Sequence, residues 1–314
     1  MKNIFVAAAL FAAGSNMFAL TFWSEAPNRE AGSAKMGELR YYSENNNTGI
    51  LKGQPAKGDS IVFRDGADFT NIIDKDIAIR EITVNSHVLA ESRKIVMTGK
   101  LCTHLPEEFS TNMFELRKST LVSKSGVETY NVARPDAASF GAMAYKFVDS
   151  TATFSGNYVL TFNVPKLGNK EASSGSSIIL EGKSKVEFGG VVLIDNMTID
   201  NPEYTHSNFE FVERNGNIPT LVFKGTNNDL GRSSIMLRIT PAAKPGVYPL
   251  ILFSGRNAKL RGSFDYVMVN NKKLKLGEKC QVADLTVCVA MQKYKTERDS
   301  AVNDIVLTVE KSKK

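Results

Sequence analysis

The chain has 314 residues, of which 42% are hydrophobic, and its 39 lysines and arginines outnumber 33 acidic residues to give a formal net charge of +6. This length is ample for a hydrophobic core. After the N-terminus, no apolar stretch approaches the roughly 18 residues that a membrane-spanning helix needs, which excludes such a helix. The 3 cysteines and 3 histidines show no His-x-His, Cys-x-x-Cys or His-Glu-x-x-His spacing, which excludes the usual metal motifs.

The N-terminal residues have the pattern of a secretory signal. Lys2 supplies a positive charge, and the apolar run Ile4–Ala13 that follows is too short to cross a bilayer as a stable helix. Cleavage can follow Ser15 or Ala19; the alternative is a buried N-terminal helix. We expect residues 1–19 to be a signal peptide, and the protein to be secreted or held at the cell surface without a transmembrane segment.

The stretch Arg40–Phe63 prepares the chain for its first strand. Aromatic residues are followed by a polar, Asn-rich run, and Pro55 and Gly58 then permit a turn. Asp59 can accept hydrogen bonds from neighbouring backbone amides as the chain enters a strand at 60–63. We therefore expect a turn-rich lead-in to a β-rich body.

Short alternating apolar runs, bounded by Gly, Asn, Asp, Pro or Ser, predict strands throughout the chain. They cover residues 60–63, 77–84, 93–101, 114–122, 157–164, 176–182, 184–199, 220–225, 234–240, 248–253, 264–269 and 304–310. No helical periodicity is sustained beyond about ten residues after the signal. The close, fairly even spacing indicates an all-β sandwich, barrel or solenoid.

The turns between these strands do not decide the topology. Gly182 and the pair Gly189–Gly190 separate very short strands, which suits the coils of a β-helix and equally suits a meander of hairpins. No exact repeat period is visible. We expect one domain over residues 20–314, a right-handed parallel β-helix or solenoid-like fold, with a β-sandwich as the alternative. We interpret Ala133–Met143 and Lys166–Ser177 as long loops, the first alternatively as a short helix.

The cysteines predict one disulfide in an oxidising compartment. Cys280 and Cys288 flank seven residues that could double back as a tight hairpin and bring the two Cα atoms within bridging range. Cys102 would then be a buried free thiol.

Candidate chemical residues are few. The dispersed histidines are interpreted as surface or loop residues: His87, His104 and His206. Two polar clusters could supply oxygen ligands to calcium, but are interpreted as Asx-turns between strands: Asp65, Asp68, Asp74 and Asp76, and the loop residues Asn227, Asn228 and Asp229. The densest basic cluster, Asn270–Lys279, could attract anionic glycans, or could be a solvated strand edge that lysines protect from aggregation.

Both ends of the chain resemble a known family. The segments "LTFW", "NNNTGILKGQPAKGDSIVF" and "IDKDIAIREITVNS", with "PGVYPLILFSGRNAKLRGSF" and "DIVLTVEK" near the C-terminus, resemble autotransporter-associated β-strand repeat proteins of Planctomycetes–Verrucomicrobia-type bacteria. The resemblance implies strands stacked into a coil and carries no catalytic signature. Tyr41 and Tyr42 stand where that family has a second tryptophan. With Trp23, we expect these rings to cap the open end of the first coil.

These observations predict an exported, non-enzymatic surface, adhesive or structural β-repeat protein. We expect no catalytic, cofactor-binding or metal residues and no nucleic-acid partner, and anionic glycans or cell-surface polymers as partners. One alternative is a glycan-binding module with Trp23, Tyr41 and Tyr42 as platforms. The other is a polysaccharide-active enzyme on a β-helix, which would show a groove of carboxylates, or of carboxylates beside Lys and Arg.

Overall fold

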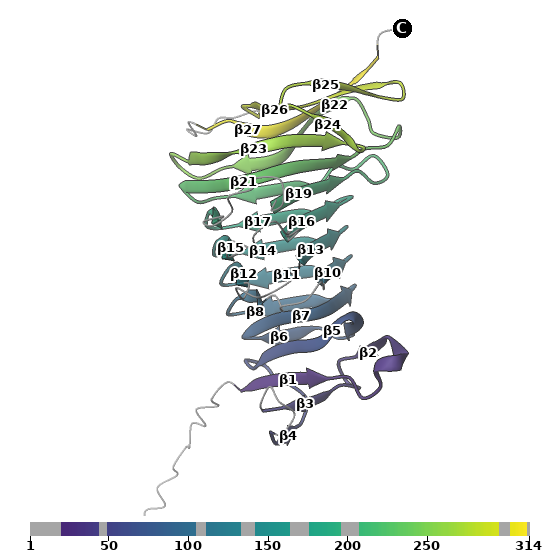
Figure 1. The fold of residues 1–314 in the computed structure, drawn as a ribbon, viewed down its shortest axis with the longest axis vertical. Helices are drawn as coiled ribbons and strands as arrows, with labels where there is room; N and C mark the ends of the chain where they lie inside the picture. The colour runs from purple at the N-terminus through teal and green to yellow at the C-terminus, as the bar shows by residue number, and fades with distance from the viewer. Residues whose placement is uncertain are drawn as a thin grey trace, which may run out of the picture.

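The computed structural model describes residues 20–43, 49–104, 111–132, 142–163, 176–195, 207–294 and 302–312. Within these ranges the chain is all-β, as predicted, with one short 3-10 turn, η1 (Arg29–Ala31), and without a helix able to cross a membrane. Figure 1 shows strands stacked in layers along one long axis, with β1 (Thr21–Glu25) near one end of the stack and β27 (Asp304–Lys311) near the other. The predicted signal peptide and most of the two predicted loops lie outside the described residues.

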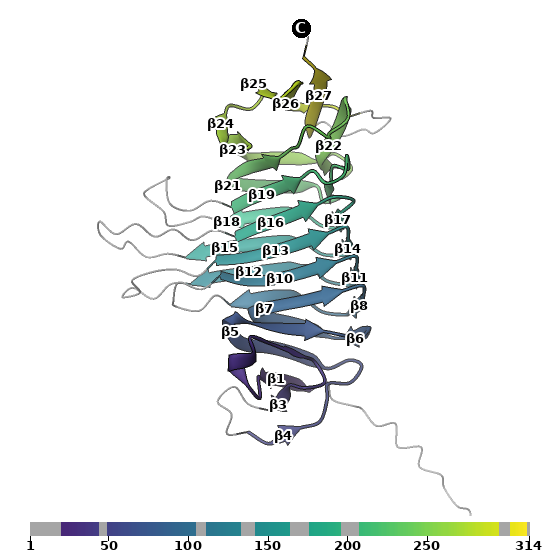
Figure 2. The same ribbon diagram turned by 90° about the vertical axis from the view of Figure 1, so that its right-hand side faces the viewer.

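Parallel strands form three columns along this axis (Figures 1 and 2). The first column contains β5 (Ser60–Ile73), β7 (Glu81–Glu91), β10 (Thr111–Arg117), β13 (Ala142–Val148), β16 (Ser176–Glu181), β19 (Ser207–Val212), β21 (Asn227–Arg238) and β23 (Lys259–Val269). The second contains β6 (Ile77–Ile79), β8 (Lys94–Met97), β11 (Thr120–Ser123), β14 (Thr151–Phe154), β17 (Lys185–Phe188), β20 (Thr220–Phe223) and β22 (Gly246–Phe253). The third contains β9 (Leu101–His104), β12 (Val127–Val132), β15 (Tyr158–Asn163) and β18 (Val192–Asp195).

Each turn of the chain adds one strand to each column, so that β10, β11 and β12 are followed by β13 beside β10. The long strands β7 and β21 each pair with a strand of the first column and with a strand of the third column. They therefore join these two columns at two levels of the stack, and the parallel pairings form a closed circuit. Gly189–Gly190 joins β17 and β18, which lie in different sheets, so this turn is a corner and not a hairpin. Parallel pairing of successive turns differs from the antiparallel hairpins of a sandwich.

The core lies inside the stack because alternate residues of each strand point inward. The second column carries a phenylalanine ladder, in which Phe154, Phe188, Phe223 and Phe253 occupy the same register on successive strands. Neighbouring rings stack with centroids 4.9, 5.4 and 6.1 Å apart. All four side chains are buried. The ladder therefore couples successive turns through one continuous aromatic contact.

A serine ladder forms the corner between the first and second columns. The backbone N–H of Ser119 donates to Oγ of Ser150 at 3.0 Å, and that of Ser150 donates to Oγ of Ser184 at 3.1 Å. Lys118 and Asp149, just before the first two serines, have positive φ angles of 49° and 47°. The left-handed residue makes the bend, and the buried serine satisfies backbone groups there. This corner fixes the edge of the site described below.

The N-terminal segment covers the first coil through β1 (Thr21–Glu25), β2 (Ser33–Lys35), β3 (Arg40–Tyr42) and β4 (Leu51–Lys52). β1 pairs in parallel with β5 and antiparallel with β3. Tyr41 is buried, packs edge-on against Phe22 and donates to the carbonyl of Met36 at 3.1 Å. Trp23 and Tyr42 lie opposite each other and are half-buried. Of the three predicted cap residues, Tyr41 is therefore buried at the first coil, whereas Trp23 and Tyr42 are covered only in part.

The C-terminal end is an antiparallel extension of the second column, comprising β25 (Lys279–Val282), β26 (Leu285–Gln292) and β27 (Asp304–Lys311), with β24 (Lys272–Leu274) on β23. The predicted hairpin between the two cysteines exists, but the predicted disulfide is wrong, because both thiols are free. Cys280 pairs with Val287 and Cys288 pairs with Lys279, so the two cysteines point to opposite faces. Cys102 is a buried free thiol, as predicted.

Candidate functional site

The described surface has a charged groove over the first column, at the C-terminal ends of its strands. Its volume is about 300 Å³. The lining residues are Glu91, Glu115, Arg117, Lys118, Lys146, Val148, Glu181 and Arg214. We call this feature the charged groove.

Strand alternation places these residues on the outer face. In β10, Phe114 and Leu116 are buried in the core, so Glu115 and Arg117 point the other way. Parallel register then sets Glu115 beside Lys146 of β13. The site is therefore a consequence of how turns of the coil align.

The hollow itself comes from one short side chain. Val148 lies beside Arg117 on one side and beside Glu181 on the other in the strand register. The valine is buried and forms the floor, while its two long neighbours rise beside it. Any long side chain in place of Val148 would fill the groove.

Glu115 is the electrostatic centre of the groove, and its side chain is only 2% exposed. Its Oε1 accepts from Nε of Arg117 at 2.9 Å and lies 3.1 Å from Nζ of Lys146, while Oε2 lies 3.5 Å from Nε2 of His87. Burial raises the pKa of Glu115, but these three contacts outweigh burial and lower the pKa to about 2. The carboxylate consequently stays ionised at physiological pH.

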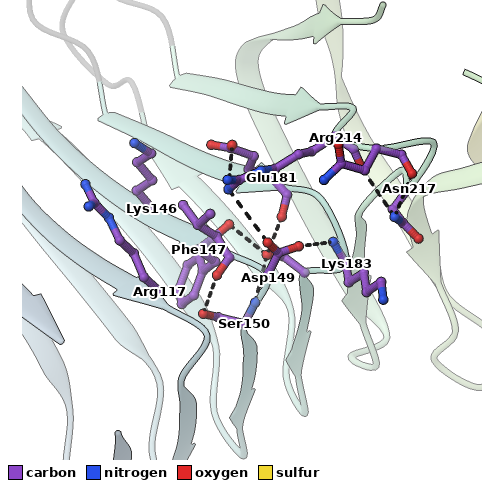
Figure 3. Close-up of polar contacts among 12 residues, drawn as sticks. Arg117, Lys146, Phe147, Asp149, Ser150, Glu181, Lys183, Arg214 and Asn217 are labelled. Carbon is purple, nitrogen blue, oxygen red and sulfur yellow. Dashed lines mark hydrogen bonds and ion pairs between the residues drawn. The ribbon is translucent and has the colours of Figure 1, made fainter. Parts of the chain in front are cut away.

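The far wall of the groove is a second ion cluster, drawn in Figure 3. Nη1 of Arg214 lies 3.2 Å from Oε1 of Glu181 and 3.7 Å from Oδ2 of Asp149. Asp149 also accepts from the backbone N–H of Lys183 at 3.0 Å. In the same figure, Arg117 and Lys146 lie to the left of Glu181 and Asp149, on the side away from Arg214. One arginine thus serves two carboxylates here.

Two cations of the charged groove, Arg117 and Lys118, are accessible to a ligand. The side chain of Arg117 is 44% exposed, and its pKa is raised mainly by the hydrogen bond with Glu115, with smaller contributions from Glu91 and Glu181. Lys118 is exposed at the corner and forms no ion pair with any residue in the described ranges. Both side chains can contact an incoming anion without losing a buried partner.

The chemistry of the lining favours charge recognition. Its carboxylate centre is held ionised by cations, and the eight described lining residues include no Ser, Cys, His or Tyr. No group of described residues has the geometry of a metal site. Lys and Arg, in contrast, are the side chains that bind carboxylate, sulfate and phosphate groups.

The histidines have different outcomes. His87 lies in strand β7, half-buried beside Glu115, and its Nδ1 is 3.0 Å from Oγ1 of Thr70. Of the two predicted positions, surface or loop, the loop is therefore wrong. Only the backbone of His104, in β9, is described, and His206 lies outside the described residues.

The first predicted acidic cluster serves structural hydrogen bonds. Asp65 accepts from Oγ of Ser24 at 2.7 Å and from the backbone N–H of Ala26 at 2.6 Å, while Asp76 accepts from the N–H of Lys94 at 2.8 Å. These carboxylates tie neighbouring segments together. Asp68 and Asp74 join no described group able to hold a metal.

Two predictions about polar turn residues have opposite outcomes. Asp59 accepts from the backbone N–H of Ala56 at 2.8 Å, which confirms its role at the strand entry. Asn227, Asn228 and Asp229 lie in β21 and pair in register with β23, so their placement in a loop is wrong. The predicted Asx-turn is present at Asp229, whose Oδ1 accepts from the backbone N–H of Gly231 at 2.9 Å. Side-chain polarity suggested a loop there, but a strand near a corner tolerates such residues when their side chains are bonded.

The other predicted binding features carry little support. The aromatic platform is not formed, because Tyr41 is buried and its two aromatic neighbours are half-buried. The basic segment Lys272–Lys275 includes β24, whose only strand partner in the described chain is β23. Nζ of Lys273 lies 4.5 Å from the ring centre of Tyr266. This arrangement agrees with a lysine-protected strand edge.

Sequence reasoning did not select the residues of the charged groove. Glu115, Lys146 and Glu181 lie in separate predicted strands or gaps, and no short motif contains two of them. The available signal was a recurrence of similar segments at the interval of one coil turn, which brings such residues into register. No protein-family model, curated protein or solved structure matches this chain.

Proposed function

We propose that this protein is an exported, non-enzymatic β-solenoid of the cell surface, and that its charged groove binds anionic glycans. The observation that carries the proposal is the group of three cations that line the charged groove together with Glu115: Arg117, Lys118 and Lys146. Cations in a partly desolvated hollow attract anions more strongly than cations scattered over a surface. Export is supported by the pattern of residues 1–19.

The proposal includes the hand of the coil. Strand connections that return to a parallel neighbour in the same sheet are right-handed in about 98% of proteins. Successive strands of the first column, such as β10 and β13, are connected in this way. A right-handed parallel β-helix is therefore the form we propose for the stack.

A polysaccharide-active enzyme is the second candidate. The observation that favours it is one carboxylate, Glu115, within about 3 Å of both an arginine and a lysine in a single groove. The ion pairs of Glu115 and Glu181 argue against it, since acid–base catalysis needs a group that can gain or lose a proton near neutral pH.

The test measures binding of acidic and neutral polysaccharides by isothermal titration calorimetry. Lys146→Met removes a cation from the groove, and Lys185→Met is the matched control, because Lys185 forms its ion pair with Glu187 in the second column. We expect salt-sensitive binding of an acidic polysaccharide that Lys146→Met weakens at least about tenfold and Lys185→Met leaves unchanged.

Two outcomes would overturn the proposal. One is equal affinity for acidic and neutral polysaccharides, or equal loss in the two lysine variants. The other is new reducing ends or unsaturated sugars released from a bound polysaccharide, which would establish the enzyme instead.

A further inference from the structure

The positive centre of the charged groove is narrow. Arg117 and Lys118 come from β10 and its corner, and Lys146 comes from the adjacent strand β13. Three cations against the one carboxylate of Glu115 leave a formal surplus of two positive charges. Because neighbouring strands lie about 4.8 Å apart, this surplus spans roughly the width of two strands.

Acidic residues border that centre on both sides along the axis of the stack. Glu91 of β7 pairs in register with Arg117 on one side. On the other side, the same row continues through Val148 to Glu181 of β16. Both carboxylates attract Arg117 and contribute to its raised pKa, which agrees with their positions around it.

Neither border is fully neutralised by ion pairs among the described residues. Glu91 is exposed and forms no ion pair within the described chain. Glu181 shares Arg214 with Asp149, so that side keeps a formal surplus of one negative charge. The order of charge along the axis is therefore negative, positive, negative.

This order discriminates among anionic ligands. A chain with an anionic group on every unit would set a charge against Glu91 or Glu181 when another charge contacts the positive centre, and like charges in an interface are costly. A chain with one anionic group between neutral sugars would instead offer hydroxyl donors to both carboxylates. The volume of about 300 Å³ lies at the small end of ligand pockets, which suits a compact group.

We propose that the charged groove selects one compact anionic sugar, such as a single uronic acid, flanked by neutral, hydroxyl-rich sugars, and rejects chains charged on every unit. This inference rests on the proposed glycan binding at the same groove. It assigns Glu91 and Glu181 as the residues that determine specificity.

The test compares three oligosaccharides of equal length: one with a single uronic acid among neutral sugars, one with a uronic acid at every position, and one fully neutral. Affinities are measured by calorimetry at low and moderate salt. We expect the wild-type protein to bind the singly acidic probe at least about tenfold more tightly than the fully acidic probe, with the neutral probe weakest.

Removal of the bordering charges provides the second arm. The double variant Glu91→Gln, Glu181→Gln should bind the fully acidic probe at least about tenfold more tightly than wild type, while the matched variant Glu187→Gln in the second column should not. Glu91→Gln alone should give part of this gain. It changes an exposed residue without an ion pair among the described residues, so it is expected to fold.

The outcomes separate the two proposals. The selectivity would be overturned if wild type bound the fully acidic probe as tightly as the singly acidic probe, or more tightly. It would also be overturned if neither Glu91→Gln nor the double variant bound the fully acidic probe more tightly than wild type. Both results would leave the groove as an anion site. Failure of both acidic probes to bind more tightly than the neutral probe would overturn the proposed function as well.

Discussion

Replacement of Glu115 by glutamine should make the protein less stable at neutral pH, and the loss should shrink in acid. The pKa of this buried carboxyl falls from an ordinary 4.5 to about 2, because contacts from His87, Arg117 and Lys146 outweigh its burial. Each pKa unit is worth about 1.4 kcal/mol, so ionised Glu115 contributes about 3 kcal/mol to the free energy of unfolding at pH 7. A lowered folded-state pKa means that this contribution is present above about pH 4.5 and disappears as pH falls toward 2.

The assay is urea unfolding of wild type and Glu115→Gln between pH 7 and pH 2.5, followed by circular dichroism. We expect a difference of about 3 kcal/mol from pH 7 to pH 5 that falls below about 1 kcal/mol near pH 2.5. Glu187→Gln is the control, since Glu187 is more exposed and its two ion pairs with Lys185 and Lys224 lie on the surface. A pH-independent difference, or one equal to that of the control, would refute the assigned role of Glu115.

Three further predictions concern the stack. Phe188→Ala should lower the free energy of unfolding by about 3 to 5 kcal/mol in urea titrations, because the phenylalanine ladder loses a buried ring stacked on both sides. Gly225→Ala should cost about 1 to 3 kcal/mol in the same assay, since the new Cβ would lie 2.6 Å from the carbonyl carbon of Gly190. Iodoacetamide should label Cys288 in the folded protein, whereas Cys102, buried and with a pKa raised to about 11, should react only after unfolding, as read by mass spectrometry.

Much of the fold was predictable because its signals are local. Alternation of apolar residues identified the strand at 304–310, which the structure extends by one residue as β27. The aromatic lead-in placed Tyr41 at the first coil, where it is buried. Such features depend on a few neighbouring residues, so they can be predicted without knowing how the rest of the chain is arranged.

The cysteine pair shows where local reasoning fails. The hairpin from Cys280 to Cys288 was predictable, but its register was not, because Val282 and Leu285 pair across a two-residue turn. That register places Val287 opposite Cys280. Cys288 is one position further along the strand, so its thiol points to the other face. A turn longer by one residue would reverse this result, since a one-residue slip exchanges the faces of a strand.

The charged groove could not be predicted for a related reason. Its residues are neighbours across successive strands and not along the sequence. Glu115 and Lys146 are 31 residues apart, and Ser119 and Ser150 of the serine ladder share that interval, whereas Ser150 and Ser184 are 34 apart. Variable lengths of this kind blur any exact repeat period. Once the serines align the turns, however, two kinds of register position can be told apart. At some positions identical residues stack and stabilise the fold, as in the phenylalanine ladder. At others, side chains of opposite charge follow one another on successive strands and form no regular packing. In a coil of this type, the register positions at which successive strands do not repeat the same residue are those where a binding site should be sought first.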